Sequence, residues 1–404
     1  MRRHMAWIVV SVLAMSTVVA MGGPADASVR TAAAPSGAPI KVGVICSCSG
    51  AFGSNVAPAA KVADAWAKSV NANGGLNGHP VDITIDDDAS TPGTSVARAQ
   101  SMIADNVDVI LDLTVLDAAW ADAVTQAKIP VVGGSFSNTV FYQNPNFYPS
   151  GQTNDSIVYA NVLTAKKAGA KNFGQLYCAE APVCQESVAP HKAAGKKLGV
   201  PDVYNASISA TAPNYTAQCV AAQQAGVKAL FIGHSSSVVA RVAADCDRQG
   251  YKPIYITEGT GFSMQLTSAP GIKDKLWSPY PILPFYANEP AVKTMNAALD
   301  KYQPGLRTDE NAWSEYAAQA WTGGLLIAKA VQASGMAAGD TPSATAITKG
   351  LDSVKNETLD GWSPPLTFTA GKPHSVDCWF TARMQNGKPA LVNGGKQTCH
   401  SPSA

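Results

Sequence analysis

Short apolar runs alternate with amphipathic stretches in the first part of the chain, and this alternation restricts the fold more than any other feature. "PIKVGVIC" (39–46) is a short continuous apolar run, as a buried parallel strand should be, and "VDITID" (81–86) alternates apolar and polar residues. Between these two strands, Val62, Trp66 and Val70 recur at every fourth position, which is one face of a helix. A second helix is expected to start near Pro92. "VDVILDL" and "IPVVGG" follow as strands, with a helix over about 117–127 between them. This order predicts an α/β fold with a mostly parallel sheet flanked by helices.

The same series resumes after "NPNFYPSGQTND" (144–155), whose Pro, Asn and Ser residues predict a crossing between two lobes. The next expected strands are "NFGQLY", "DVYNASI", "VKALFI" and "KPIYIT", with Ala-rich helices between them. "LPFYANEP" (283–290) and "GWSPPLTF" (361–368) predict two more crossings. Between them we expect a helical stretch from about Pro290 to Ser334. One side of it should carry Trp313, Tyr316, Ala317, Ala320, Trp321 and Leu325. A hairpin that turns at Asn386-Gly387 follows the third crossing.

Three crossings imply that each lobe is built from separate parts of the chain. A length of 404 residues also favours two lobes. We expect one lobe to contain residues 39–149 and 286–362, and the other to contain residues 150–285 and 363–404.

The N-terminus has the features of a signal peptide. Arg2 and Arg3 precede an apolar run from Ala6 to Met21, and Ala25 and Ala27 fit the small-residue rule for cleavage before Ser28. The predicted signal peptide is therefore 1–27, and the small residues of 28–38 predict a flexible linker. An uncleaved membrane anchor is the alternative, although the run is short for a spanning helix. The protein is expected to be exported, to a periplasm, the cell envelope or the medium.

Eight cysteines behind a signal peptide predict disulfides. The chain has no C-x-x-C pair and few histidines, so the spacing does not resemble a zinc site. Closeness in sequence favours the pairs Cys178–Cys184, Cys219–Cys246 and Cys378–Cys399. Cys46 and Cys48 are then left to bond each other or to remain free thiols.

The charge balance and the acidic residues bear on nucleic-acid binding and on metal binding. Lys plus Arg number 30 and Asp plus Glu 29, so no basic excess favours nucleic acid. Asp86, Asp87 and Asp88 could hold a metal ion, but the favoured interpretation is a loop that caps the helix at Pro92. No metal and no cofactor are expected.

The stretch from "KVGVICSCSGAFG" to "DDDASTPGTSVARAQSMI" resembles the opening of the leucine/isoleucine/valine-binding type of extracytoplasmic solute-binding protein. It has the strand, the Ser-Gly loop, the long helix, "NANGGLNGHPV" and the acidic loop of that family in order. "IPVVGGSFSN", "TEGTGF" and "PLTFTAGK" continue the match. The resemblance implies the two-lobed periplasmic-binding-protein type I fold with three hinge crossings. It also implies a solute held in the interlobe cleft and delivered to an ATP-driven (ABC) importer.

The resemblance also suggests which residues bind the solute. Ser135 and Ser137 match positions that bind a ligand carboxylate, where helix N-termini and backbone N–H groups favour an anion. Their alternative role is to cap the next helix. Thr114 is similar to the family's other hydroxyl position, and Phe52 to its aromatic residue over the ligand. Glu258 matches the acidic residue that holds a ligand's ammonium group. For these three residues, a purely structural role in a loop is the alternative.

"GHSSS" (233–237) raises a different possibility, because a serine on a strand-to-helix turn can be a hydrolase nucleophile. A nucleophile elbow needs G-x-S-x-G, but Ser237 stands at the fifth position. His234 and Ser235 are therefore expected to contact a solute or to belong to the loop only.

The favoured function is that of an exported monomer that captures a small solute for an ABC permease. The expected solute is an amino acid, an amide or a small aromatic acid. The alternatives are an exported serine hydrolase using Ser235 and a ligand-sensing module for a membrane receptor. Ligand binding without turnover would separate the binding protein from the hydrolase.

Overall fold

The computed structural model describes residues 34–133, 138–309 and 313–400, and its N-terminal part is a parallel five-stranded sheet. The strand order is β2-β1-β3-β4-β5, and every neighbouring pair is parallel. The strands are β1 (Ile40–Cys46), β2 (Val81–Asp87), β3 (Val109–Leu113), β4 (Val131–Gly133) and β5 (Phe147–Pro149). All positions of β3 are buried, as in a sheet covered on both faces. The predicted parallel sheet is therefore confirmed.

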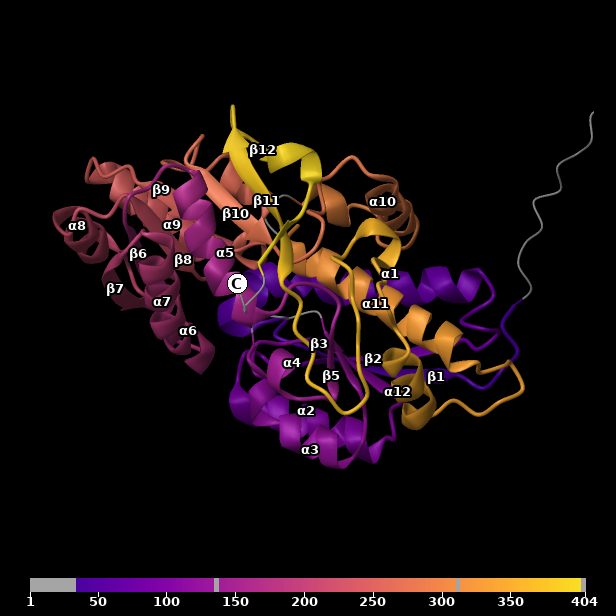
Figure 1. The fold of residues 1–404 in the computed structure, drawn as a ribbon. Helices are drawn as coiled ribbons and strands as arrows, with labels where there is room; N and C mark the ends of the chain where they lie inside the picture. The colour runs from indigo at the N-terminus through magenta and orange to yellow at the C-terminus, as the bar shows by residue number, and fades with distance from the viewer. Residues whose placement is uncertain (1–33, 134–137, 310–312, 401–404) are drawn as a thin grey trace, which may run out of the picture. The chain divides into compact units, whose positions relative to one another are not determined.

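The second sheet has eight strands, in the order β12-β11-β10-β9-β8-β6-β7, with β13 paired to β11. The strands are β6 (Phe173–Cys178), β7 (Asp202–Ile208), β8 (Ala229–Gly233), β9 (Ile254–Ile256), β10 (Leu276–Tyr280), β11 (Cys378–Gln385), β12 (Lys388–Leu391) and β13 (Thr398–Cys399). Pairing is parallel from β7 to β10, and the β11–β12 hairpin adds antiparallel strands beside β10 (Figure 1). Asn386 and Gly387 have positive φ angles of 53° and 73° and form the predicted hairpin turn.

Helices cover both faces of each sheet. On the first sheet, α1 (Gly53–Ala72) and α11 (Glu315–Ser334) pack together over one face, and α2 (Pro92–Ala104) and α3 (Ala121–Gln126) cover the other (Figure 1). On the second sheet, α5 (Asn154–Lys167) and α7 (Val188–Leu198) cover one face, and α8 (Thr216–Gln224) and α9 (Ser236–Arg248) cover the other. The remaining helices are α4 (Val140–Gln143), α6 (Pro182–Glu186), α10 (Pro290–Tyr302) and α12 (Ala344–Asp352).

The close contact between α1 and α11 depends on a glycine. A Cβ atom on Gly324 would lie 2.4 Å from the indole of Trp66, which is itself only 1% exposed. The absence of a side chain at this position therefore lets the two helices approach closely.

The three predicted crossings lie side by side. The N–H of Gln152 in the first crossing donates to the carbonyl oxygen of Pro281, at 3.0 Å, just before the second. The N–H of Leu283 in the second crossing donates to the carbonyl oxygen of Trp362 in the third, at 2.7 Å. These backbone bonds hold the three segments together where the chain passes between the two lobes.

The structure differs from the sequence-based expectation in three places. The helical stretch expected from Pro290 to Ser334 is two helices, because Gly305 has a positive φ of 86° and follows a proline. Trp313 therefore precedes α11 and does not lie on its apolar side. The expected helix over 117–127 is a 3₁₀ turn (Asp117–Ala119) followed by the short α3. Strands β5, β10 and β13 and helix α12 were not expected.

Part of the expected linker is fixed to the first lobe. The N–H groups of Ser36 and Gly37 donate to the carbonyl oxygen of Gly78, at 3.1 and 2.9 Å. The ring of His79 contacts the carbonyl oxygens of Ala38 and Ala337, at 2.7 and 2.8 Å. The predicted signal peptide lies outside the described residues. Within 34–133, 138–309 and 313–400, no helix is long and apolar enough to cross a membrane.

Candidate functional site

A cavity lies where the carboxyl ends of strands from both sheets face each other. The first lobe lines it with Phe52, which follows β1, Val115, which follows β3, and Asn55 and Tyr316 from the first turns of α1 and α11. The second lobe lines it with residues at or just after the carboxyl ends of β6, β8 and β9, together with Asn154 and Phe231. The former are Tyr177, Ala181, Val183, Cys184, Ser187, Gly233, His234, Ser235, Thr257, Glu258, Thr260 and Gly261. This edge is where α/β sheets bind ligands.

The cavity suits a small molecule with an apolar part. Its volume is about 90 Å³. Rings and aliphatic groups make up much of its wall, and a few polar groups stand among them, which is the usual composition of a ligand pocket.

Glu258 is the acidic side chain of the cavity wall, and none of the residues that the structure describes gives it a cationic partner. It follows β9, and its carboxylate accepts hydrogen bonds from Asn161 Nδ2, at 3.1 Å, and Thr260 Oγ1, at 3.3 Å. Burial raises the pKa of Glu258, and these two neutral donors offset the effect only in part. A positively charged ligand group at this point would restore the ionised carboxylate and pair with it.

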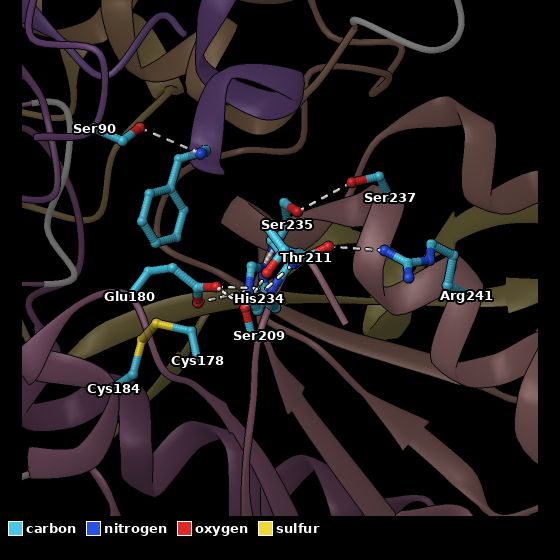
Figure 2. Close-up of polar contacts among 12 residues, drawn as sticks. Ser90, Cys178, Glu180, Cys184, Ser209, Thr211, His234, Ser235, Ser237 and Arg241 are labelled. Atoms are coloured by element: carbon cyan, nitrogen blue, oxygen red, sulfur yellow. Dashed lines mark hydrogen bonds and ion pairs between the residues drawn. A yellow bond between two sulfur atoms is a disulfide. The ribbon is translucent and has the colours of Figure 1, made fainter. Parts of the chain in front are cut away.

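His234 and Glu180 form a second polar pair at the cavity. His234 Nε2 lies 3.1 Å from Glu180 Oε2, and the N–H of Ser235 donates to His234 Nδ1 at 2.8 Å. Because Nδ1 accepts this bond, the ring hydrogen is on Nε2 and points at Glu180, whose carboxylate lies beside the imidazole in Figure 2. Burial lowers the pKa of His234, so the imidazole is neutral. Its ring stacks on Phe52 of the other lobe, with centroids 5.8 Å apart.

Glu180 is held in place from several directions. Burial alone would raise the pKa of Glu180. The N–H of Ala210, at 2.7 Å, and the hydroxyl of Ser209, at 2.8 Å, donate to its carboxylate and stabilise the ionised form, so the pKa is lowered. The disulfide Cys178–Cys184 closes the loop that carries Glu180, as Figure 2 shows. This side chain is therefore fixed, and it orients the imidazole of His234.

The arrangement around Ser235 does not form a catalytic triad among the described residues. A general base must accept a proton from the serine hydroxyl. Both ring nitrogens of His234 are already engaged, by Glu180 and by the backbone of Ser235. Ser235 Oγ instead bonds to Ser237 Oγ, at 3.2 Å. Ser235 is a wall residue of the cavity in this geometry.

Thr114 does not line the cavity. Its hydroxyl donates to Asp88 Oδ2, lies 2.9 Å from Ser47 Oγ and is fully buried. The carboxyl groups of Asp112 and Asp117 complete this buried network. Burial and mutual repulsion raise the pKa of Asp112 well above its usual range, and burial raises the pKa of Asp117 to about 7. Val115, the next residue along the chain, reaches the cavity in place of Thr114.

The predicted site residues therefore divide into three groups. Phe52, His234, Ser235 and Glu258 are brought together around one cavity. Thr114 is directed into the buried network of the first lobe. Ser135 and Ser137 lie outside the described residues, so their role stays a prediction.

Several lining residues were not predicted, chiefly Asn55, Tyr177, Thr260 and Tyr316. Tyr177 and Thr260 could have been found by applying the strand-end rule to β6 and β9. Asn55 and Tyr316 lie in the first turns of helices, and no motif in the sequence distinguishes them.

The triplet Asp86, Asp87 and Asp88 organises its own loop, as the loop interpretation expected, but it does not cap the helix at Pro92, whose N-terminus has no side-chain cap. Asp87 Oδ1 accepts the N–H groups of Ser49 and Ala89, at 3.1 and 2.9 Å. Asp88 Oδ1 accepts that of Ser90, at 2.8 Å. Across the described parts of the chain, no group of three His, Cys, Asp or Glu residues is placed to hold a metal ion.

All eight cysteines are paired in four disulfides. The pairs are Cys46–Cys48, Cys178–Cys184, Cys219–Cys246 and Cys378–Cys399, as closeness in sequence predicts. The alternative of free thiols at Cys46 and Cys48 does not hold in the structure.

Comparison with known proteins places this fold and site in context. The sequence matches the family model described as periplasmic binding protein over residues 39–389. No curated protein matches the sequence significantly. A fatty acid ABC transporter substrate-binding protein from Thermomonospora curvata is 18% identical, with a TM-score of 0.76 over 91% of this chain and 95% of that chain. A branched chain amino acid ABC transporter from Thermus thermophilus with bound valine is 13% identical, with a TM-score of 0.79 over 90% and 97%. A solute binding protein from R. palustris in complex with benzoate is 15% identical, with a TM-score of 0.73 over 90% and 98%. At these identities the likeness concerns the fold.

Proposed function

Because this chain belongs to the periplasmic binding protein family, we propose that it captures a small organic solute in the cavity between its lobes and delivers it to an ABC importer. The observation that carries this proposal is the cavity itself. Loops at the carboxyl ends of strands from both sheets converge on it, and its wall combines an apolar surface with the carboxylate of Glu258. A solute held by both lobes binds the closed form better than the open one, and so favours closure.

The chemistry of the wall favours a zwitterionic amino acid of modest size. Glu258 supplies a partner for an ammonium group, and Phe52, Val115 and Tyr316 offer apolar surface to a side chain. None of the described lining residues is Lys or Arg. A ligand carboxylate would therefore rely on N–H groups and hydroxyls, for which Ser135 and Ser137 remain the candidates. An amide fits the same pattern, and a small aromatic acid would leave Glu258 without a partner.

The partner and the location of the protein follow from its role as a solute-binding protein. The partner is an ABC permease in the membrane, the protein acts as an exported monomer, and nucleic acid is not a ligand. The predicted lobe boundaries, 39–149 with 286–362 and 150–285 with 363–404, put Phe52 and Tyr316 in one lobe and His234 and Glu258 in the other. The solute would then contact both lobes at once.

A thermal-shift screen followed by calorimetric titration tests the function. The compounds are valine and leucine as zwitterions, an amide such as nicotinamide, benzoate as an aromatic acid, and octanoate as a fatty acid. A compound that binds only the folded protein raises its stability by RT ln(1 + [L]/Kd), which is about 2.7 kcal/mol at a hundredfold excess over Kd. We expect an amino acid to give the largest shift. Hydrolysis of an ester by the purified protein, with no binding of any compound in the panel, would contradict the proposal.

A further inference from the structure

Asn55 lies in the first turn of α1, on the first lobe, but its side chain bonds mainly to the second lobe; within its own lobe Oδ1 accepts only the hydroxyl of the neighbouring Ser54, at 3.4 Å. Asn55 Nδ2 donates to the carbonyl oxygen of Thr260, at 2.7 Å. Asn55 Oδ1 accepts the N–H of Ser236, at 3.0 Å, and the hydroxyl of Ser236, at 2.8 Å. The residue is 2% exposed. Three of the four hydrogen bonds of this buried carboxamide in the first lobe are thus made with groups of the other lobe, and they are the shorter ones.

The bond to Ser236 replaces a missing helix cap. The first N–H groups of a helix have no partner within the helix, and a side chain just before the helix usually accepts one of them. Ser235 stands at that position of α9, but its side chain makes no capping bond. Asn55, which is 181 residues away in sequence, accepts the N–H of Ser236 in its place. The cap of α9 therefore exists only while the two lobes are in contact.

The same groups border the cavity, since Asn55 and Thr260 both line it. Separating the walls of the cavity breaks the hydrogen bonds from Asn55 to Thr260 and Ser236. Each of these polar groups must then form a hydrogen bond to water. The backbone oxygen of Asn55 meanwhile accepts the hydroxyl of Ser314, at the start of α11, which holds this turn of α1 within its own lobe.

We propose that Asn55 is an interlobe latch, a positioning residue that stabilises the closed arrangement independently of the solute. This inference rests on the proposed function in one respect: closure of the lobes matters because it captures the solute. Three bonds of ordinary net strength would raise the ratio of closed to open protein by roughly tenfold to a thousandfold. The latch thereby sets how far the solute-free protein is already closed, and hence how much binding free energy the solute spends on closure.

Asn71 provides a matched control on the same helix. Its carboxamide also bridges two backbone groups, donating to the carbonyl oxygen of Val81, at 2.9 Å, and accepting the N–H of Val81, at 2.7 Å. Both partners of Asn71 belong to its own lobe. Asn71→Ala should therefore lower stability without opening the protein, whereas Asn55→Ala should open it.

The test uses the full, disulfide-bonded protein after exhaustive dialysis to remove bound solute. Small-angle X-ray scattering gives the radius of gyration, and hydrogen exchange follows the amides in the peptide 234–241. For Asn55→Ala we expect a larger radius of gyration and at least tenfold faster exchange at the start of α9. Asn55→Asp keeps the acceptor for Ser236 but loses the donor to Thr260, and should give an intermediate result. Asn71→Ala should match the wild type in both measurements.

Two outcomes would overturn the latch. One is a radius of gyration and an exchange rate in Asn55→Ala that equal those of the wild type. The other is an equal increase in the radius of gyration and in the exchange rate in Asn55→Ala and Asn71→Ala, which would indicate a general loss of stability. If Asn55→Ala does not fold, Asn55→Asp decides by the same criteria. Because no ligand is used, a failure of the proposed function, seen as no binding in the screen, is distinguishable from a failure of the latch.

Discussion

Replacing Glu258 with glutamine should separate ligand binding from stability. Glutamine keeps the size of the side chain and an acceptor oxygen for Asn161, but it removes the charge. In the closed cavity, an ammonium group would then be buried without its partner. This costs roughly 2–5 kcal/mol for a desolvated charge pair. At about 1.4 kcal/mol per tenfold, the Kd for an amino acid should rise by a factor of at least about thirty.

The same substitution should not weaken the solute-free protein. Burial raises the pKa of Glu258, so the ionised carboxylate is disfavoured in the folded state. A carboxyl group whose pKa is raised by folding lowers stability at pH values above its usual pKa. Removing the charge at neutral pH should therefore leave the melting temperature unchanged or higher. Weaker binding without loss of stability is the signature of a residue that serves the ligand.

Calorimetric titration and thermal unfolding of wild type and Glu258→Gln provide both measurements. Benzoate, which has no ammonium group, should be affected less than about threefold if it binds, since it does not use the charge pair. Glu289→Gln is the matched control, because Glu289 is exposed and lies outside the cavity. An amino acid that binds Glu258→Gln as tightly as wild type would refute the reasoning. Glu258 would then be a residue of the loop only.

Three further predictions concern charge, catalysis and cross-links. Burial raises the pKa of Asp117 to about 7, so the folded state holds a proton that the unfolded state has lost. His191 and His374, whose pKa values burial lowers to about 4, act with the opposite sign as the pH rises to about 7.5, so the effect is read as a difference from a variant. Between about pH 6.5 and 8, urea unfolding should show the wild type losing roughly 1 kcal/mol of stability relative to Asp117→Asn. Ser235→Ala should keep solute binding, and ester hydrolysis by the wild type that disappears in this variant would contradict the binding role. Replacing Cys219 and Cys246 together by serine removes the link between α8 and α9 and should cost roughly 2–4 kcal/mol in urea unfolding, whereas an unchanged midpoint would show that the bond contributes nothing.

The sequence predicts the regular parts of this fold well because their signals are local. β1, β2 and the helix from Pro92 are defined by apolar periodicity and by proline at a helix start. β5 and β10 each contain a proline, which argues against a strand. They are strands because neighbours from elsewhere in the chain pair with them, and a single segment does not reveal such partners.

The same distinction applies to the site. The family resemblance suggested Glu258 and the GHSSS loop suggested His234, but the partner that orients His234 is Glu180, which lies 54 residues earlier and after a different strand. Thr114 is at the end of a strand as well. Its hydroxyl is drawn away from the cavity by Asp88, a residue of the acidic loop, and that competition depends on tertiary contacts. Asn55 shows where prediction from the sequence ends, because its main hydrogen-bond partners lie in the other lobe and no local pattern marks it.

The interleaved course of the chain determines when folding can be completed during synthesis. Trp277 in β10 pairs with Arg383 in β11, so the second sheet lacks its last strands until nearly the whole chain has been made. The face of the first sheet that carries Leu111 is covered by α11, against Gly323, and stays open until this helix, Glu315–Ser334, has been made. Contacts between such distant residues form slowly because long loops must close first. Neither lobe can therefore mature as an early, independent unit on the ribosome, and the polypeptide remains a substrate for chaperones or a translocation channel until its final third is available.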